Sequence, residues 1–151
     1  MPVTIDGTSG VTFNDNSVQA ASAFFKRNNI LGQVTQSAGV PTGAVIERGS
    51  NANGEFVRFA DGTQICTVIF PSTAIPANVS VSIGSVNFPA AFVGLAPSLA
   101  ASGSPTISAD FFGVVFFQTP SSLTTMTPIV RNGGTAQNYA EGRGTAIGRW
   151  F

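Results

Sequence analysis

The sequence has no histidine and a single cysteine among its 151 residues. Without histidine the chain has no Ser-His-Asp or Cys-His catalytic group, and it lacks a common ligand of catalytic zinc. One cysteine forms no disulfide within the chain. Cys66 lies in an apolar run, where a buried small side chain is expected rather than a reactive thiol. We therefore expect no catalytic centre, no metal site and no cofactor.

Charged residues are scarce, at 9% of the chain, against about 25% in an ordinary globular protein. Seven basic residues balance seven acidic ones. Nucleic acids and anionic membranes both require a basic patch, so neither is an expected partner. A neutral surface with 43% hydrophobic residues is poorly protected against association. These properties favour a homo-oligomer, and a monomer with an unusually neutral surface is the alternative.

Long apolar runs are also missing. The longest, Phe111–Phe117, is far shorter than the roughly 20 residues of a membrane helix. We expect it to form a central strand buried on both faces. No early segment combines a basic start with an apolar stretch, so no signal peptide is expected. The protein is expected to be made in a cytoplasm without membrane insertion.

The remaining chemical motifs are weak. Gly133-Gly134 and Gly142-Arg143-Gly144 lack the helix and lysine of a phosphate-binding loop, and Asp61-Gly62 lacks the Asp-x-Asp series of a calcium loop. Two of the scattered carboxylates would suffice for a glycosidase, so a glycan-depolymerising enzyme remains a hypothesis. Single carboxylates in a β-protein are more often solvated or paired with arginine. We predict that the protein is not an enzyme.

The clearest local signal is a β-hairpin. The runs Glu55–Ala60 and Thr63–Phe70 flank Asp61-Gly62, a pair typical of a type I′ turn with positive φ at both central residues. In the first strand, alternation places Phe56 and Arg58 on one face and Val57 on the other.

Short alternating runs separated by turn residues continue along the chain. About eight to ten such strands predict an all-β fold, an antiparallel β-sandwich or jelly roll. We assign residues 44–151 to this head domain, and residues 1–43 to a short extended attachment or trimerisation segment and linker. The first strands are too short to bury a core alone and need sister chains or another protein. The residues expected to make this attachment are Val3, Ile5, Val11, Phe13 and Val18.

The longest predicted loop, Asn132–Gly144, is the candidate recognition surface. An aromatic residue and an arginine on a polar loop suit contact with carbohydrate, although a loop tyrosine that packs on its own domain is an alternative. The candidate ligand-binding residues are Asn132, Asn138, Tyr139, Glu141 and Arg143. Trp150 is a second aromatic candidate, but its place in the closing strand favours a core or subunit-interface role over a sugar platform.

Three stretches resemble the C-terminal head domain of tailed-phage tail fibres. They are Gly43–Cys66, Phe88-Pro-Ala-Ala-Phe92 with Ala96-Pro97, and Ala146–Phe151. The amino end, from Ile5 to Phe13 with Ser17-Val18-Gln19, resembles segments of phage fibre shafts and attachment regions. The Phe-Pro-x-x-Phe…Pro pattern is also similar to the H-type lectin fold, a trimerising sandwich.

The resemblance implies a homotrimeric virion fibre, made in the host cytoplasm, whose head binds a host-surface glycan during adsorption. Residues 1–30 would then contact another virion protein of the tail, baseplate or capsid. Tail fibres usually carry a long shaft, and the segment before this head is short, so we expect a short fibre seated directly on the particle. The alternative is a purely structural virion component, such as a head fibre, capsid decoration or baseplate protein.

Overall fold

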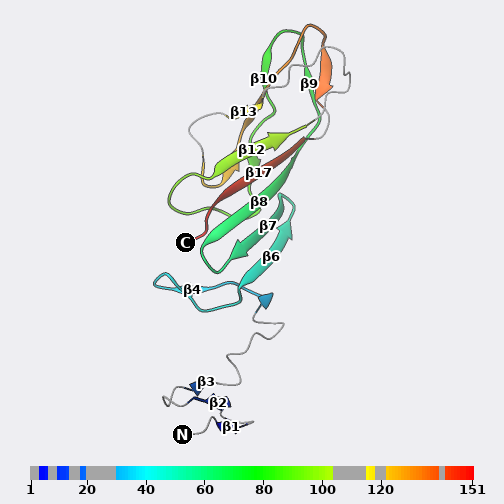
Figure 1. Cartoon of the computed structure of the whole chain (residues 1–151). Coiled ribbons are helices and arrows are strands. Elements are labelled where there is room, and N and C mark those ends of the chain that lie inside the picture. The colour runs from blue at the N-terminus through cyan, green and yellow to red at the C-terminus, as the bar shows by residue number, and fades with distance from the viewer. Residues whose placement is uncertain are drawn as a thin grey trace.

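The chain forms antiparallel β-sheets joined by turns and short connections (Figure 1). The computed structural model describes residues 4–6, 10–13, 18–19, 30–103, 115–117, 122–139 and 142–151. The prediction of an all-β, antiparallel fold is confirmed.

The amino-terminal strands form a small sheet in the order β1-β2-β3. Its strands are β1 (Thr4–Asp6), β2 (Gly10–Thr12) and β3 (Val18–Gln19). Ile5 stands opposite Val11, and Thr12 stands opposite Val18. The alternating pattern at this end of the sequence therefore predicted its strands correctly.

A five-stranded sheet in the order β12-β17-β8-β7-β6 is the largest described layer. Its strands are β6 (Ile46–Asn51), β7 (Gly54–Phe59), β8 (Thr63–Phe70), β12 (Ser98–Ser102) and β17 (Gly142–Arg149). All neighbouring strands in it are antiparallel, and β17 and β8 are paired along their whole lengths. The carboxyl-terminal strand thus lies in the middle of the sheet, between segments distant from it in sequence.

The β7–β8 hairpin forms where the sequence predicted it, but its turn is of another type. The loop holds Ala60, Asp61 and Gly62, and only Gly62 has a positive φ, at 91°. The Gly62 amide donates to the Phe59 carbonyl at 3.0 Å. This is a three-residue loop with glycine at the left-handed position, so the type I′ prediction is wrong. Hydrogen bonds from Thr63, chiefly from its backbone amide, hold the pKa of Asp61 below its usual value.

Smaller sheets cover one face of the five-stranded sheet. Their strands are β9 (Thr73–Ile75), β10 (Ser80–Ser82), β11 (Val86–Asn87), β13 (Val115–Phe117), β14 (Thr125–Met126), β15 (Pro128–Arg131) and β16 (Gln137–Tyr139). They pair in the orders β10-β15-β13, β11-β14 and β16-β9. Among the described strands, β13 lies at the edge of its sheet. The prediction that Phe111–Phe117 forms a central strand is therefore wrong for residues 115–117. Residues 111–114 lie outside the described residues.

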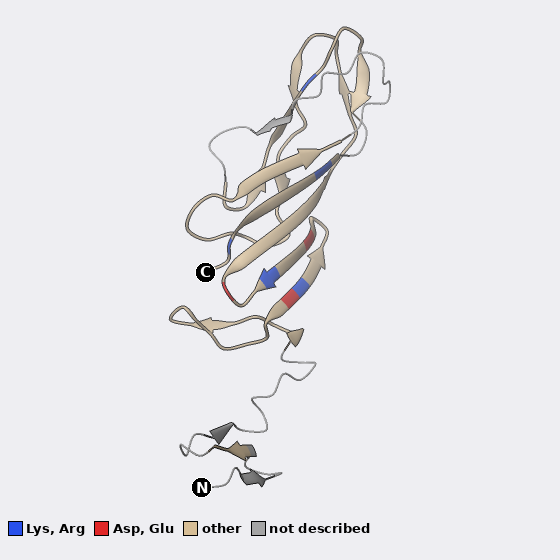
Figure 2. Ribbon diagram, viewed as in Figure 1, with Lys and Arg blue, Asp and Glu red and all other residues tan. Residues whose placement is uncertain are grey.

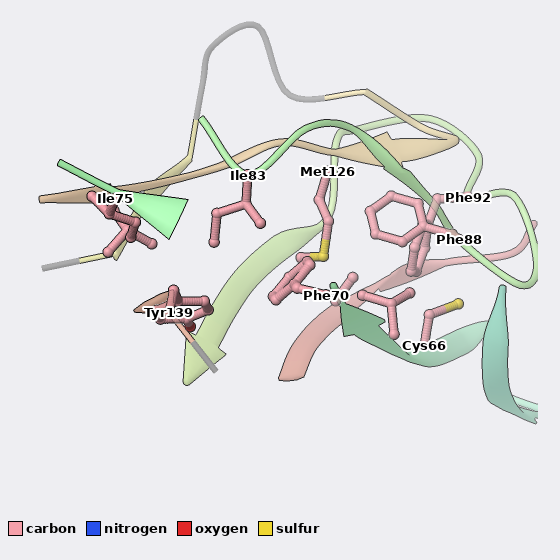
Figure 3. Packing of buried hydrophobic residues seen from close by; sticks show 11 residues of the cluster. Cys66, Phe70, Ile75, Ile83, Phe88, Phe92, Met126 and Tyr139 are labelled. Atoms are coloured by element: carbon pink, nitrogen blue, oxygen red, sulfur yellow. The ribbon is translucent and has the colours of Figure 1, made fainter. Parts of the chain in front are cut away.

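The hydrophobic core lies between these layers (Figure 3). Alternation along β8 turns Gln64, Cys66, Val68 and Phe70 inward. The buried cluster comprises Cys66, Val68, Phe70, Ile75, Ile83, Phe88, Phe92, Met126, Val130, Tyr139 and Ala146. Burial raises the pKa of the Cys66 thiol, which agrees with its predicted role as a small core side chain rather than a nucleophile.

Strand β17 turns its smallest residues toward this core. Its inward positions are Gly142, Gly144, Ala146 and Gly148. A Cβ atom at Gly144 would lie 2.5 Å from the Phe70 ring and 2.7 Å from the Met126 sulfur, and one at Gly148 would lie 2.8 Å from Phe92. The aromatic rings therefore sit directly on the backbone of β17, and the Gly-x-Gly motif serves packing.

A buried polar side chain, Gln64, lies at the edge of the core near the hairpin turn. The Gln64 side chain is fully buried, and its amide nitrogen donates to the carbonyls of Ala90 and Ala91 at 3.0 and 3.2 Å. Its amide oxygen accepts a 2.8 Å hydrogen bond from Arg58. The Arg58 guanidinium lies over the ring of Trp150, whose indole nitrogen donates to the Phe59 carbonyl. Trp150 thus packs within its own domain.

Replacing Gly144 by alanine should destabilise the head by about 1–3 kcal/mol, because the added methyl group has no room between Phe70 and Met126. Gly134→Ala is the matched control, since a Cβ there meets nothing within 4 Å. Urea unfolding followed by circular dichroism measures both variants. Equal unfolding midpoints for the two would contradict the packing role of β17.

Candidate functional site

The head has two distinct ends (Figure 1). At one end lie β4 (Gln36–Ser37) and β5 (Val40–Pro41), in the segment through which the chain enters the head. This segment is hydrogen-bonded to the head, since Gly32 donates to the Ile46 carbonyl and Ala44 to that of Gln33. At the opposite end lie β9 and β10. We call residues 72–80 and 131–139, which form this opposite end, the distal tip.

The Asn132 side chain holds the distal tip together. Asn132 is 2% exposed, and its amide nitrogen donates to the carbonyls of Ile75, Pro76 and Thr135, each at 2.9 Å. Its amide oxygen accepts from the Gly133 amide at 2.9 Å and from the Gln137 side chain at 2.7 Å. Every hydrogen-bonding group of this buried side chain is thus used, which fixes two connections remote in sequence against each other.

Backbone hydrogen bonds reinforce the same junction. The Asn132 amide donates to the Val79 carbonyl at 3.0 Å, and the Asn78 amide donates to that of Gly133 at 2.7 Å. Asn78 has a φ of 60°, a conformation that asparagine tolerates better than most residues. The exposed Asn78 side chain is therefore presented on a fixed turn.

Tyr139 lies in the interior of the distal tip rather than on its surface. It is 1% exposed, and its hydroxyl finds no hydrogen-bond partner among the described residues. Burial raises the pKa of this phenol. Gly103 and Gly142 leave the room that its ring occupies, since a Cβ at either would collide with it. Tyr139 therefore belongs to the core.

The outer surface of the distal tip is polar and carries little charge. Arg131 is the only charged residue within its two described stretches. The exposed polar residues there are Ser72, Asn78, Ser80, Arg131, Thr135 and Asn138. Amide, hydroxyl and guanidinium groups on a rigid support can hydrogen-bond the hydroxyl groups of a sugar without demanding a charged ligand.

The structure separates the predicted ligand-binding residues. Asn138 is exposed at the tip, on β16, and Arg143 is exposed on β17 in the five-stranded sheet. Asn132 and Tyr139 are buried, so direct contact with a surface ligand does not fit either side chain. Glu141 lies outside the described residues. The predicted loop is also wrong as a single element, because β16 and the first residues of β17 lie within it.

Sequence reasoning missed five of the six exposed polar residues of the tip, among them Asn78, Ser80 and Arg131. The Pro76-Ala77-Asn78 turn was the available signal for the first, because proline followed by asparagine marks a turn. Ser80 and Arg131 lie at the ends of short strands and have no motif of their own. Their pairing across β10 and β15, Ser80 opposite Arg131, is visible only in the structure.

The predicted attachment residues remain untested. Val3 lies outside the described residues, while Ile5 and Val18 belong to β1 and β3. Val11 is half-buried, and Phe13 is exposed.

The residues that the structure describes contain no group of three or more histidine, cysteine or acidic side chains placed to hold a metal ion. They also contain no helix long and apolar enough to span a membrane.

Comparison with known proteins finds no matching family model and no significantly similar curated protein. Three solved structures of R-type pyocin tail fibres are similar to part of the chain. An amino-terminally truncated R2-type fibre is 23% identical, with 72% of this chain and 39% of the fibre chain covered and a TM-score of 0.49.

The other two come from P. aeruginosa. The C-terminal part of an R2 fibre is 23% identical, with 69% of this chain and 26% of that chain covered and a TM-score of 0.48. The C-terminal part of an R1 fibre is 18% identical, with 66% and 27% covered and a TM-score of 0.49. The chain thus spans well under half of each fibre chain that it matches, and with TM-scores below 0.5 the likeness is partial.

Replacing Asn132 by alanine should cost about 2–4 kcal/mol of stability, because buried carbonyls and amides lose their partners. Hydrogen exchange of the Asn78 and Gly133 amides should accelerate more than exchange in β8. Ser80→Ala, which removes an exposed hydroxyl, is the control and should change stability by less than about 0.5 kcal/mol. An Asn132→Ala protein with unchanged stability and unchanged exchange at the tip would contradict the bracing role.

Proposed function

We propose that the chain is a virion fibre protein of a tailed phage or related particle, and that its homotrimeric head binds a glycan on the host cell surface. The observation that carries this proposal is the difference between the two ends of the head. The chain enters at the end that holds β4 and β5, and a braced, exposed polar tip lies at the opposite end (Figure 1). A fibre head needs this arrangement, because one end faces the particle and the other faces the host.

Two features of the sequence support the same proposal. The stretches Gly43–Cys66 and Ala146–Phe151 resemble the head domain of tail fibres. The low charge and the abundance of amides and hydroxyls suit a neutral, polyhydroxylated ligand. Attachment to a tail, baseplate or capsid protein through residues 1–30 completes the proposal.

The proposed binding is weak at each tip and strong for the assembly. A shallow surface with a few hydrogen-bonding groups gives low affinity, and linking several heads makes each further contact intramolecular. Avidity then supplies firm adsorption without a deep pocket. Catalysis forms no part of the proposal, so incubation with host polysaccharide should release no oligosaccharide.

A purely structural role is the second candidate. It is favoured by the apolar residues exposed on the five-stranded sheet, such as Ile69 and Ile147, because such a surface serves packing in a particle. Immunogold labelling of particles separates the candidates. Label at the free ends of fibres supports host binding, and label spread over the capsid supports a structural role.

Fluorescently labelled protein should stain cells of at least one bacterial strain in a panel that includes the strain that propagates the particle. The combined substitutions Asn78→Gly and Arg131→Ala should lower this staining about tenfold or more, because they remove two exposed hydrogen-bonding side chains. Glycine at position 78 keeps the positive φ.

Leu95→Ser is the control, since Leu95 is 88% exposed on a loop outside the tip, and its staining should equal that of the unmodified protein. Absence of staining on every strain, or equal staining by the tip variant, would rule out receptor binding through the tip.

A further inference from the structure

The outer face of the five-stranded sheet, opposite the core, carries an apolar row across three of its strands. Ile147, Ile65 and Val57 stand side by side on three neighbouring strands. Ile147 is 48% exposed, and Ile69 in the same face is 50% exposed. The solvent face of an antiparallel sheet normally carries polar residues at such positions. An apolar row that crosses three strands on the outer face of a sheet therefore favours association through that face.

Two adjacent hollows shape this face. One, of about 400 Å³, is lined by residues that include Arg48, Ser50, Val57 and Ile65. The other, of about 370 Å³, is lined by residues that include Ile69, Arg143 and Thr145. Glu55 and Thr67 line both hollows. The face thus offers recesses that side chains of a partner can enter.

The charges of this face have both signs. Glu55 on β7 lines one hollow together with Arg48 on β6 and the other together with Arg143 on β17. Figure 2 shows basic and acidic residues among these strands. Glu55, Arg48 and Arg143 are all exposed, and no described residue forms an ion pair with any of them. A surface with unpaired charges of both signs beside an apolar row is complementary to a copy of itself.

The same charges disfavour an anionic glycan at this face. Glu55 lines both hollows, so a phosphate or carboxylate bound beside either arginine would also meet a carboxylate. A second copy has no such conflict, because its arginines can approach Glu55 while its apolar row covers Ile147 and Ile65.

We propose that copies of this chain pack against one another through the outer face of the five-stranded sheet. The apolar rows bury each other, and Glu55 of one copy pairs with Arg48 or Arg143 of a neighbouring copy. This inference rests on the oligomeric part of the proposed function and adds the surface that makes the oligomer. It leaves the distal tip free, because the tip lies at the end of the head and not on this face.

Light scattering after size exclusion tests the inference on the full chain. The unmodified protein should have a mass that is a multiple of 15.5 kDa. Glu55→Arg should reduce the mass to one chain, because it places three arginines together. Arg143→Glu or Arg48→Glu is then added to the Glu55→Arg protein. The double variant that restores the oligomer mass identifies the arginine that pairs with position 55 across the interface. Leu95→Arg, which adds one positive charge on an exposed loop outside this face, should leave the mass unchanged.

The possible failures can be told apart. A single-chain mass for the unmodified protein overturns the homotrimer of the proposed function as well as this interface. If Glu55→Arg keeps the oligomer mass, or if neither double variant restores that mass after dissociation, the interface alone is overturned. If circular dichroism shows that Glu55→Arg has lost its β-structure, Thr145→Arg in the middle of the same face is tested instead. An unchanged oligomer mass in Thr145→Arg then also overturns the interface.

Discussion

Close contact between aromatic rings and the backbone of β17 is the constraint on which the head depends. The inward positions of that strand carry only glycine and alanine, so Phe70, Phe92 and Tyr139 lie against the strand itself. Larger side chains would hold the covering layer away from the five-stranded sheet. Because β17 pairs with both β8 and β12, this one strand positions both the sheet and the core above it.

The same strand separates the two faces of the sheet by chemistry. Its inward residues form the floor of the core, and its outward residues, Arg143, Thr145, Ile147 and Arg149, belong to the face that we assign to neighbouring copies. The distal tip is built differently, with buried amide hydrogen bonds instead of apolar packing. In the proposed assembly, the tip at one end, the chain entry at the other and the outer sheet face between them would each have a separate role.

The sequence predicted what local pattern determines. Alternation located the β7–β8 hairpin, because both strands and their turn lie within one short stretch. It also predicted an all-β head from the spacing of turn residues. It failed where distant residues decide the outcome. Asn132 reads as a loop residue, yet its partners include carbonyls 56 and 57 positions away, and the glycines of β17 read as a loop because glycine is uncommon in strands.

Accessibility of the outer face in the assembled protein is the most direct test of this arrangement. Single cysteines are introduced as Ile69→Cys and Ser80→Cys in a Cys66→Ala background, and each assembly is treated with a maleimide reagent. Both parent side chains are exposed in the isolated chain. We predict rapid labelling at position 80 in the tip and at least tenfold slower labelling at position 69. Equal rates at the two positions would contradict a head whose outer sheet face is covered by its neighbours.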